Sequence, residues 1–373
     1  MTAAAPTPRR GYLDWLRGVA VLIMIQGHVT DSWTLLADRQ RTVYGWITLV
    51  GGLAAPMFLF LAGAALVLGA QTRVIKGRNP SEAAATARKH GWQVFGLAFL
   101  FRLQSWIISG GAPETLLKVD ILNIMGPSML ATALLWGASR GRWPRAATLM
   151  GAAIAVAMLT PVVRAAGSLD LLPDPLERYL RPFPGGTTFT LFPWAGFVLA
   201  GGALGVWLGE ARSPRNERLL NIALVPIGIA IALGAYGASF LPAIYEQTSF
   251  WTSSPTFFFL RVGIVVLLLP LAYAWNTLNG ERSWLREYGR SSLLVYWVHV
   301  ELVYGVLTLP FHRKLPLEQA YFGFIILSGL LFGVVKVKNG FMERRRLGRE
   351  SVASRPLAAT LLPGSGERPL NSR

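Results

Sequence analysis

The sequence contains no cysteine among its 373 residues. Disulfide bonds, thiolate nucleophiles and cysteine-ligated metal centres are therefore excluded, although the absence does not determine the compartment. Charged residues are also scarce, because they make up only 15% of the chain, whereas soluble domains carry about a quarter. A soluble globular domain is thus a poor description of this chain.

Metal and nucleotide motifs are missing as well. The four histidines, His28, His90, His299 and His312, show no HxxxH spacing, and no EF-hand loop is present. No glycine-rich segment ends in Gly-Lys-Ser/Thr, which binds nucleotide phosphates. We therefore expect no metal and no permanently bound cofactor, and we do not expect ATP-driven transport by this chain alone.

Long apolar runs are the most abundant feature, and 53% of the residues are hydrophobic. Runs of about 18 residues or more can cross a hydrocarbon core of about 30 Å as helices. Lipid offers no hydrogen-bond partner to the backbone, so such runs form helices rather than sheets. We predict an all-α, polytopic integral membrane protein with about ten transmembrane helices. They are expected at about residues 12–30, 44–69, 90–109, 120–139, 146–163, 188–208, 219–240, 257–278, 291–309 and 318–337.

The net charge of +17 is unevenly distributed. With both termini placed in the cytoplasm, the odd-numbered loops carry only eight of the 36 Lys and Arg residues: Arg39, Arg41, Lys118, Arg164, Arg178, Arg181, Arg313 and Lys314. This is the positive-inside pattern. The charge therefore indicates orientation in a cell (inner) membrane, with cytoplasmic termini and membrane lipid as a partner, and we expect no nucleic-acid partner.

The chain is expected to form one multi-pass domain over residues 1–340. The segment 341–373 is predicted to be a basic, disordered cytoplasmic tail, because four arginines precede a Pro/Gly/Ser-rich stretch. At the other end, Asp14 and Arg17 interrupt the first apolar run, so we expect a retained helix rather than a cleaved signal peptide. The sequence is compatible with a homo-oligomer.

Two odd-numbered loops, 164–187 and 241–256, are rich in residues that break helices or carry aromatic and carboxylate side chains. Both loops are predicted to lie outside the cytoplasm. Their aromatic residues could line a cleft of the size of a sugar, or they could form an interfacial aromatic belt.

Ionisable residues in the first span are the first candidates for function. At 100° per residue, Asp14, Arg17, Val21, Ile25 and His28 share one stripe of the helix. Arg17 and His28 are separated by about 16 Å along the axis, so both are expected to face one interior space. Alternatively, Asp14 and Arg17 form a structural ion pair that anchors the helix end.

The ninth span carries a second group of polar residues. Ser292, Tyr296 and His299 share one helix face, whereas Glu301 points to nearly the opposite face. An imidazole and a carboxylate on opposite faces are not expected to face lipid together. His299 is either a catalytic group or a hydrogen-bonding group between helices.

These residues carry a resemblance. Asp-x-x-Arg-Gly followed by His28 resembles the opening helix of transmembrane acyltransferases, and the chain is similar to bacterial relatives of heparan-alpha-glucosaminide N-acetyltransferase. The segments that support this, in family order, are FLFLAGAALVLG (58–69), VDILNIMG (119–126), LFPWAGFVLAGGALG (191–205) and SSLLVYWVHVELVYG (291–305). A related family with a similar first helix acylates exported polysaccharides.

The resemblance implies that an acyl group, commonly acetyl, passes from cytoplasmic acyl-CoA to a sugar amine or hydroxyl on the other side. The acceptor would be a carbohydrate or a glycolipid. Asp14 and Arg17 would then bind the donor, with the guanidinium neutralising its phosphates. His28 would act as general base or as transient acyl carrier.

The remaining predicted site residues would support the reaction. Asp120 and Asn123 would orient the acceptor or the imidazole, although Asp120 could instead be a helix-end residue. Tyr296 and Glu301 are assigned to the acceptor side or to support.

The chain departs from the family at one point. In the lysosomal branch the active histidine follows the first helix, but here no histidine lies between His28 and His90. The catalytic role passes to His28 or to His299, and we favour His28.

The alternative function is a secondary transporter or flippase with an intramembrane charged relay. Its members would be Asp14, Arg17, Arg102, Arg261 and Glu301. Binding of acyl-CoA would discriminate between the two functions, because a transporter has no reason to bind it.

Overall fold

The computed structural model describes residues 10–110, 112–246, 248–280 and 283–359. Within these ranges every long element is a helix, and extended pairing is limited to two isolated bridges, between Thr34 and Leu315 and between Val119 and Thr187. In chain order the α-helices are α1 (Gly11–Trp33), α2 (Thr42–Gly51), α3 (Ala54–Ile75), α4 (Pro80–Ser109), α5 (Ile121–Ala138), α6 (Arg142–Ala165), α7 (Asp174–Leu180), α8 (Leu191–Glu210), α9 (Pro214–Ala238), α10 (Pro255–Asn279), α11 (Trp284–Arg290), α12 (Ser292–Tyr304) and α13 (Leu317–Ala359). Short 3₁₀ helices are η1 (Asp38–Gln40), η2 (Pro113–Leu117), η3 (Gly167–Leu171) and η4 (Val306–Phe311).

The predicted spans coincide with helices, and the all-α membrane fold is confirmed. The range 44–69 is divided into α2 and α3, and the range 291–309 is helical as α12 and then η4. In the described part of the chain, seven helical segments are long and apolar enough to cross a membrane: Thr42–Ile75, α5, α6, α8, α9, α10 and Leu317–Leu347. The helices α1 and α4 are also long but carry several ionisable residues. The chain is thus a multi-pass membrane protein.

Several helices start at a proline that follows a capping side chain. Asn79 accepts a hydrogen bond from the backbone nitrogen of Ser81 at 3.0 Å, one residue before α4 begins. Ser213 and Ser254 cap α9 and α10 in the same way. Proline suits the first helical position because its missing N–H would have no partner inside the helix. These local signals fix where the helices begin.

The helices α3 and α8 pack with their backbones in contact. A Cβ atom added to Gly63 would lie 1.9 Å from the carbonyl oxygen of Val198, and one added to Gly201 would lie 1.9 Å from that of Phe60. No other residue fits at either position, and small residues are the usual means of close helix packing in membranes. Two of the segments that carry the family resemblance, 58–69 and 191–205, therefore form one central wall.

Two hydrophobic clusters share α1. Leu16 and Ala20 belong to the larger cluster, which is centred on α3, α5 and α8. Val21 and Ile25 belong to the smaller one, which includes residues of α12 and α13. The helix α1 thus lies between the two clusters.

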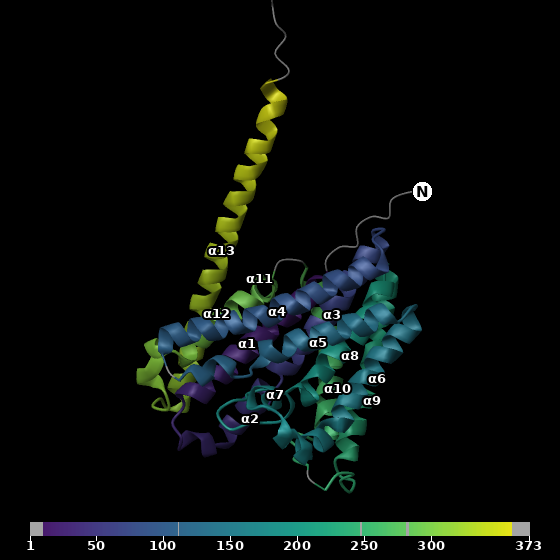
Figure 1. Ribbon diagram of the computed structural model, residues 1–373. Coiled ribbons are helices and arrows are strands. Elements are labelled where there is room, and N and C mark those ends of the chain that lie inside the picture. Colours follow the sequence, from purple (N-terminus) through teal and green to yellow (C-terminus); the bar gives the residue numbers. More distant parts are fainter. Residues whose placement is uncertain (1–9, 111, 247, 281–282, 360–373) are drawn as a thin grey trace, which may run out of the picture.

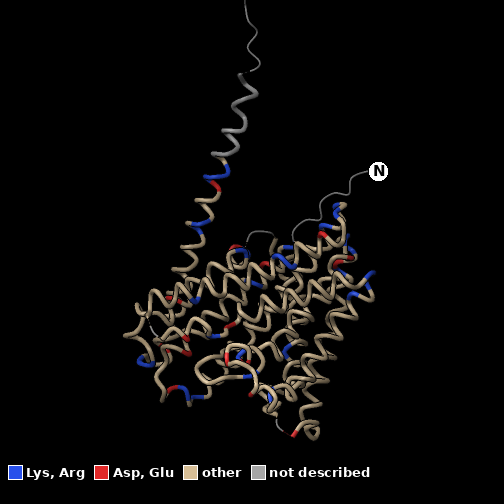
Figure 2. The backbone as a smooth tube through the Cα atoms, in the orientation of Figure 1, with Lys and Arg blue, Asp and Glu red and all other residues tan. Residues whose placement is uncertain are grey.

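The two ends of the helical body differ. Figure 1 shows α13 projecting from the end at which the chain enters α1, whereas α2 and α7 lie at the opposite end. The start of α13 is held at that opposite end, since Leu315 donates a backbone hydrogen bond to Trp33 at 3.0 Å. Lys and Arg are more numerous at the end from which α13 projects (Figure 2).

The helix α13 continues to Ala359, beyond the boundary at residue 340. The first part of the segment 341–373 is therefore helical rather than irregular, and residues 360–373 lie outside the described residues. The assignment of this segment to a separate tail stays a prediction.

Candidate active site

A cavity of about 940 Å³ runs through the helical body. Arg73 and His90 line one end of it, and Asp31, Lys118 and Thr188 line the other. One stripe of α3 follows its whole length: Ala55, Phe58, Ala62, Ala65, Gly69 and Arg73. From Ala55 to Arg73 this stripe is about 27 Å long at 1.5 Å per residue, nearly the thickness of a hydrocarbon core. The cavity is therefore long enough to reach most of the way across a hydrocarbon core.

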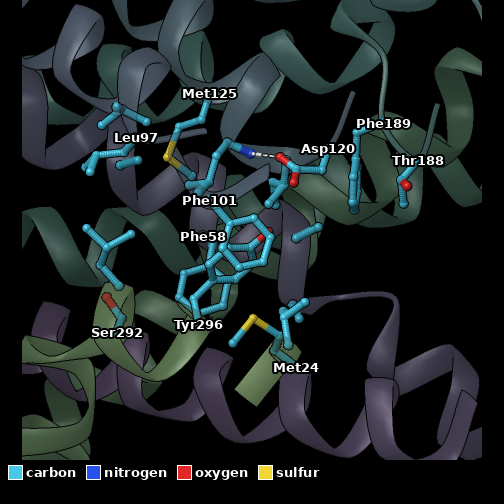
Figure 3. Close-up of a pocket in the computed structure, with 18 of the residues that line it drawn as sticks. Met24, Phe58, Leu97, Phe101, Asp120, Met125, Thr188, Phe189, Ser292 and Tyr296 are labelled. Atoms are coloured by element: carbon cyan, nitrogen blue, oxygen red, sulfur yellow. Dashed lines mark hydrogen bonds between the residues drawn. The ribbon is translucent and has the colours of Figure 1, made fainter. Parts of the chain in front are cut away.

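Figure 3 shows how side chains from several helices meet around this space. Ser292 and Leu97 lie on one side of the view, Asp120 and Thr188 lie on the other, and the ring of Tyr296 lies between them. The wall is mainly apolar in the middle. Ionisable groups lie towards both ends, and Arg17 lies between them beside Leu61 of α3.

The two candidate histidines meet in one hydrogen bond. His28 Nδ1 lies 2.9 Å from His299 Nε2, and the two rings are nearly parallel, with an interplanar angle of 14°. His28 lines the cavity. His299 is fully buried and lies behind it, with 0% of its surface exposed. The structure thus brings both predicted residues together but gives only one of them access to a ligand.

The hydrogen bonds of His299 determine which ring nitrogens carry protons. His299 Nδ1 lies 2.9 Å from the backbone carbonyl of Val295, which can only accept, so Nδ1 carries the proton. In a neutral ring His299 Nε2 is then an acceptor, and His28 Nδ1 must donate to it. His28 Nε2 is left with a lone pair, on the residue that lines the cavity. A base is therefore available at this point.

Of the two predicted donor-binding residues of α1, Arg17 and Asp14, only one lines the cavity. Arg17 lines the cavity, and its guanidinium lies 3.3 Å from Asp14 Oδ1 and 3.4 Å from the carbonyl oxygen of Leu61. Asp14 is 2% exposed and does not line the cavity. Arg290 of α11 lies 3.3 Å from its second oxygen. Asp14 therefore holds two arginines rather than facing a ligand.

At the opposite end of the cavity, Asp120 caps a helix and also lines the wall. Its carboxylate caps α5 by accepting from the backbone nitrogen of Leu122 at 3.0 Å, and Arg102 donates to it at 2.7 Å. Asn123 completes the capping box, accepting from the Asp120 nitrogen at 3.1 Å, but it does not line the cavity. Asn123 is therefore a structural residue here, while Asp120 is both a helix cap and part of the wall.

Three charged side chains lie close together at this end of the cavity: Asp120, Arg102 and Lys118. Lys118 also lines the cavity, and burial, followed by the positive charge of Arg102, lowers the pKa of its amine. The backbone holds this segment in place, because Thr188 donates to the Val119 carbonyl at 2.9 Å. The loop that ends at α8 thus covers this end of the cavity.

The helix α12 supplies Ser292, Tyr296 and Glu301 to the cavity. The helical spacing in the sequence placed Glu301 on nearly the opposite helix face from Ser292, Tyr296 and His299. In the structure Glu301 instead lines the cavity together with Ser292 and Tyr296. His299 points away from the cavity, towards His28 of α1. One carboxylate oxygen of Glu301, Oε1, is buried and has no hydrogen-bond partner among the described residues. Glu301 is therefore a second ionisable residue of α12 in the cavity wall, with this oxygen turned away from the open space.

Some lining residues were not predicted. Arg73 and His90 line the end opposite Asp120. The helical spacing of Ala62, Gly69 and Arg73 places all three on one face of α3, and this pattern could have revealed Arg73 from the sequence. By contrast, no described residue of the loop 241–256 lines this cavity, and the hypothesis of a sugar cleft in that loop stays a prediction. Within the described ranges, no group of three or more His, Asp or Glu side chains could hold a metal ion.

A family model described as heparan-alpha-glucosaminide N-acetyltransferase, catalytic, matches residues 9–234, which is more than half of the chain. The chain belongs to this family. Membership in the heparan-alpha-glucosaminide N-acetyltransferase family confirms the resemblance found in the sequence and implies a transmembrane acetyltransferase. A search of curated proteins finds no match. The matched range includes His28 but ends within α9, so α10 and α12 contribute to the cavity from outside it.

Proposed function

We propose that the chain transfers an acetyl group from acetyl-CoA, bound at the Arg73 end of the cavity, to a sugar amine or hydroxyl at the Asp120 end. The observation that carries this proposal is the single cavity that passes His28 between the two ends. A donor and an acceptor that approach from opposite membrane faces can then meet without either crossing the bilayer.

Cationic groups at one end suit the phosphates of the donor. Arg73 lies in the last turn of α3, and Arg17 lines the same cavity deeper along α1. A guanidinium is permanently charged and binds phosphate oxygens with two parallel hydrogen bonds. The small residues between Ala62 and Gly69 leave room for a narrow, extended chain beside α3.

His28 acts as the general base in this proposal. The acceptor nitrogen or oxygen attacks the thioester carbonyl carbon while His28 Nε2 takes the proton of the attacking atom. The carbon–sulfur bond then breaks, and the imidazolium returns the proton to the departing thiolate. His299 fixes the ring of His28 and its tautomer throughout, as a partner at the second nitrogen does in catalytic triads.

The orientation of the chain is part of the proposal. We infer that both termini and the Arg73 end of the cavity lie in the cytoplasm, with α2 and α7 outside, because the Lys/Arg asymmetry favours this direction. A Leu180→Cys variant can be labelled cleanly, since the chain has no cysteine. A membrane-impermeant reagent should label it in intact cells. Labelling only after lysis would reverse the orientation.

Donor binding is the first experiment. The purified protein in lipid nanodiscs should bind acetyl-CoA, and Arg73→Ala should weaken this binding by about ten-fold or more, as expected when a hydrogen bond to a charged group is lost. Arg78→Ala is the matched control, because Arg78 is an exposed arginine that follows the same helix but does not line the cavity.

The outcome separates the two functions considered for the sequence. If the parent protein binds no acetyl-CoA, the acetyltransferase proposal fails and the transporter hypothesis becomes the better one. If it binds acetyl-CoA, release of CoA in the presence of amino sugars and neutral sugars then identifies the acceptor class and distinguishes N-transfer from O-transfer.

A further inference from the structure

The antiparallel helices α9 and α10 are in close contact along only part of their shared length. A Cβ atom added to Gly228 would lie 2.7 Å from Leu267 Cγ, and one added to Gly263 would lie 2.6 Å from the backbone nitrogen of Ala232. Small residues allow membrane helices to approach this closely. The two helices therefore leave no space between them at this point.

Nearer the start of α9, the same two helices enclose a second cavity of about 600 Å³. We name it the α9–α10 groove, and it is lined by Arg218, Asn221, Ile222 and Val225 of α9 and by Pro270, Tyr273, Ala274 and Thr277 of α10. Each set has the spacing i, i+3, i+4 and i+7 of one helix face. Two faces that would ordinarily pack against each other are thus held apart.

The groove changes character along its length. Counting back from the contact of Gly228 with Leu267, the antiparallel register sets Val225 opposite Pro270 and Arg218 opposite Thr277. Both helices are apolar enough to cross a membrane, and Arg218 lies in the second turn of α9. Val225 lies about 10 Å further along the axis. One end of the groove is therefore at the depth of lipid headgroups, and the other end is at the depth of acyl chains.

Arg218 is a cation that can accept an anionic ligand at the headgroup end. It is exposed, and among the described residues no carboxylate forms an ion pair with it. The adjacent Glu217 is paired with Arg10 instead, at 2.6 Å. A guanidinium binds phosphate oxygens through parallel charge-assisted hydrogen bonds. The chemistry of this end thus suits a phosphate group.

The groove is also connected to the start of α1. Besides its ion pair with Glu217, Arg10 donates hydrogen bonds to the carbonyl oxygens of Leu208 and Ala211, each at 2.7 Å. The ring of Tyr12 meets that of Tyr273 edge to face, with centroids 5.5 Å apart. The headgroup end of the groove therefore lies at the membrane face where the chain enters α1.

We propose that the α9–α10 groove binds one anionic phospholipid, a site separate from the large cavity. The phosphate pairs with Arg218, one acyl chain lies along Ile222 and Val225, and the Tyr273 hydroxyl donates to an ester oxygen of the glycerol. Basic pockets between membrane helices bind anionic headgroups. The chain fills a volume that a packed interior would not leave empty.

Charge complementarity favours a lipid over a second copy of the chain as the occupant. In a two-fold symmetric dimer the same surface patch is present on both partners. Such a contact would bring the two Arg218 side chains to the same depth and close together. A phospholipid instead supplies the opposite charge to Arg218 and an apolar chain to the deeper end.

The test is native mass spectrometry and thermal melting of the purified, delipidated protein in detergent. The probes are dioleoyl-phosphatidylglycerol, dioleoyl-phosphatidylcholine and glycerol 3-phosphate, which has the phosphate without the chains. One phosphatidylglycerol should bind, about five-fold or more tightly than phosphatidylcholine, as expected for one basic residue. It should also raise the melting temperature, whereas glycerol 3-phosphate should not.

Two variants separate the headgroup contact from the chain contact. Arg218→Gln should reduce the preference for phosphatidylglycerol to within about two-fold, and Arg215→Gln is its control, because Arg215 is exposed in the first turn of α9 but does not line the groove. Ile222→Trp fills the groove and should weaken retention of both lipids. Its control is Ile229→Trp, at an exposed position of α9 outside the groove lining.

Four results would overturn the inference. They are no lipid retained by the parent, no preference for phosphatidylglycerol, a preference that survives Arg218→Gln, or glycerol 3-phosphate bound as tightly as the lipid. A dimer that retains no lipid and dissociates in Ile222→Trp would assign the groove to a second copy. A thermal melt of each variant without lipid shows whether its fold is intact, and Ile222→Trp still tests the site if Arg218→Gln does not fold.

Discussion

His28 and His299 belong to the same hydrogen bond, yet they occupy different surroundings. His28 lines the cavity, whereas His299 is fully buried behind it. Arg17 and Asp14 repeat the arrangement on the same helix, since Arg17 lines the cavity and Asp14 lies behind it. In each polar pair, one member lines the cavity and the other is buried behind it and contacts the first, which suggests a division between ligand binding and positioning. The four predictions below test this division of roles.

The largest expected effect is that of His28→Ala. Loss of a general base should lower the rate of acetyl transfer by about 10²-fold to 10⁴-fold, with acetyl-CoA affinity nearly unchanged. Turnover by this variant and by the control His312→Ala, whose histidine lies outside the cavity lining, is measured on a confirmed acceptor. Transfer by His28→Ala at the parental rate would show that His28 is structural.

Arg17→Ala should have the next largest effect, on donor binding. Removing one hydrogen bond to a charged group costs about 1.5–3 kcal/mol, so the Kd for acetyl-CoA should rise by about 10-fold to 100-fold. Calorimetry with acetyl-CoA measures this directly. An unchanged Kd with a lowered rate of transfer would move Arg17 from the donor to the reaction centre.

A smaller effect is expected from His299→Gln. Glutamine can still accept the proton of His28 Nδ1, but it fixes the ring less firmly, so kcat should fall by about ten-fold while KM stays constant. The melting temperature should also fall, because His299 is buried between α1 and α12. Complete loss of transfer with unchanged stability would instead identify His299 as the catalytic residue.

Asp14→Asn should have the smallest effect on activity. Asparagine keeps one acceptor for Arg17 or Arg290, so we expect donor affinity to change by less than about three-fold. Unfolding should become easier by about 1–3 kcal/mol, since a buried charge-assisted hydrogen bond is lost. A loss of donor affinity as large as that of Arg17→Ala would place Asp14 in the binding site and break the comparison.

The sequence alone predicts the helices well, because long apolar runs and proline-bearing starts are local signals. It also identifies the polar positions of α1 and α12 from their spacing. It does not determine how far each helix is rotated. That rotation depends on close packing contacts such as that of Gly289 against the carbonyl of Asp14. In the folded chain His28 lines the cavity and His299 is buried behind it.

Other features depend on several chain segments at once. Asn123 is recognisable from sequence as a polar residue near a helix start, but its capping bond to Asp120 is not. Arg261 is visible as a charge within an apolar run, whereas its position over the rings of Phe257 and Trp194 follows only from the packing of α8 and α10. Arg73 was missed because it lies close to Lys76 and Arg78 in the sequence and looks like one more basic residue at a helix end.

The backbone contact between α3 and α8 has a consequence for the size of the transferred group. Gly63 and Gly201 leave no gap into which the wall could yield, so this side of the cavity cannot move aside for a bulkier group. If the donor phosphates are anchored at Arg73, as we propose, the length of α3 then limits how far the acyl group can reach. A longer acyl chain would have to extend past His28 towards the Arg102–Asp120 ion pair, which favours short acyl groups.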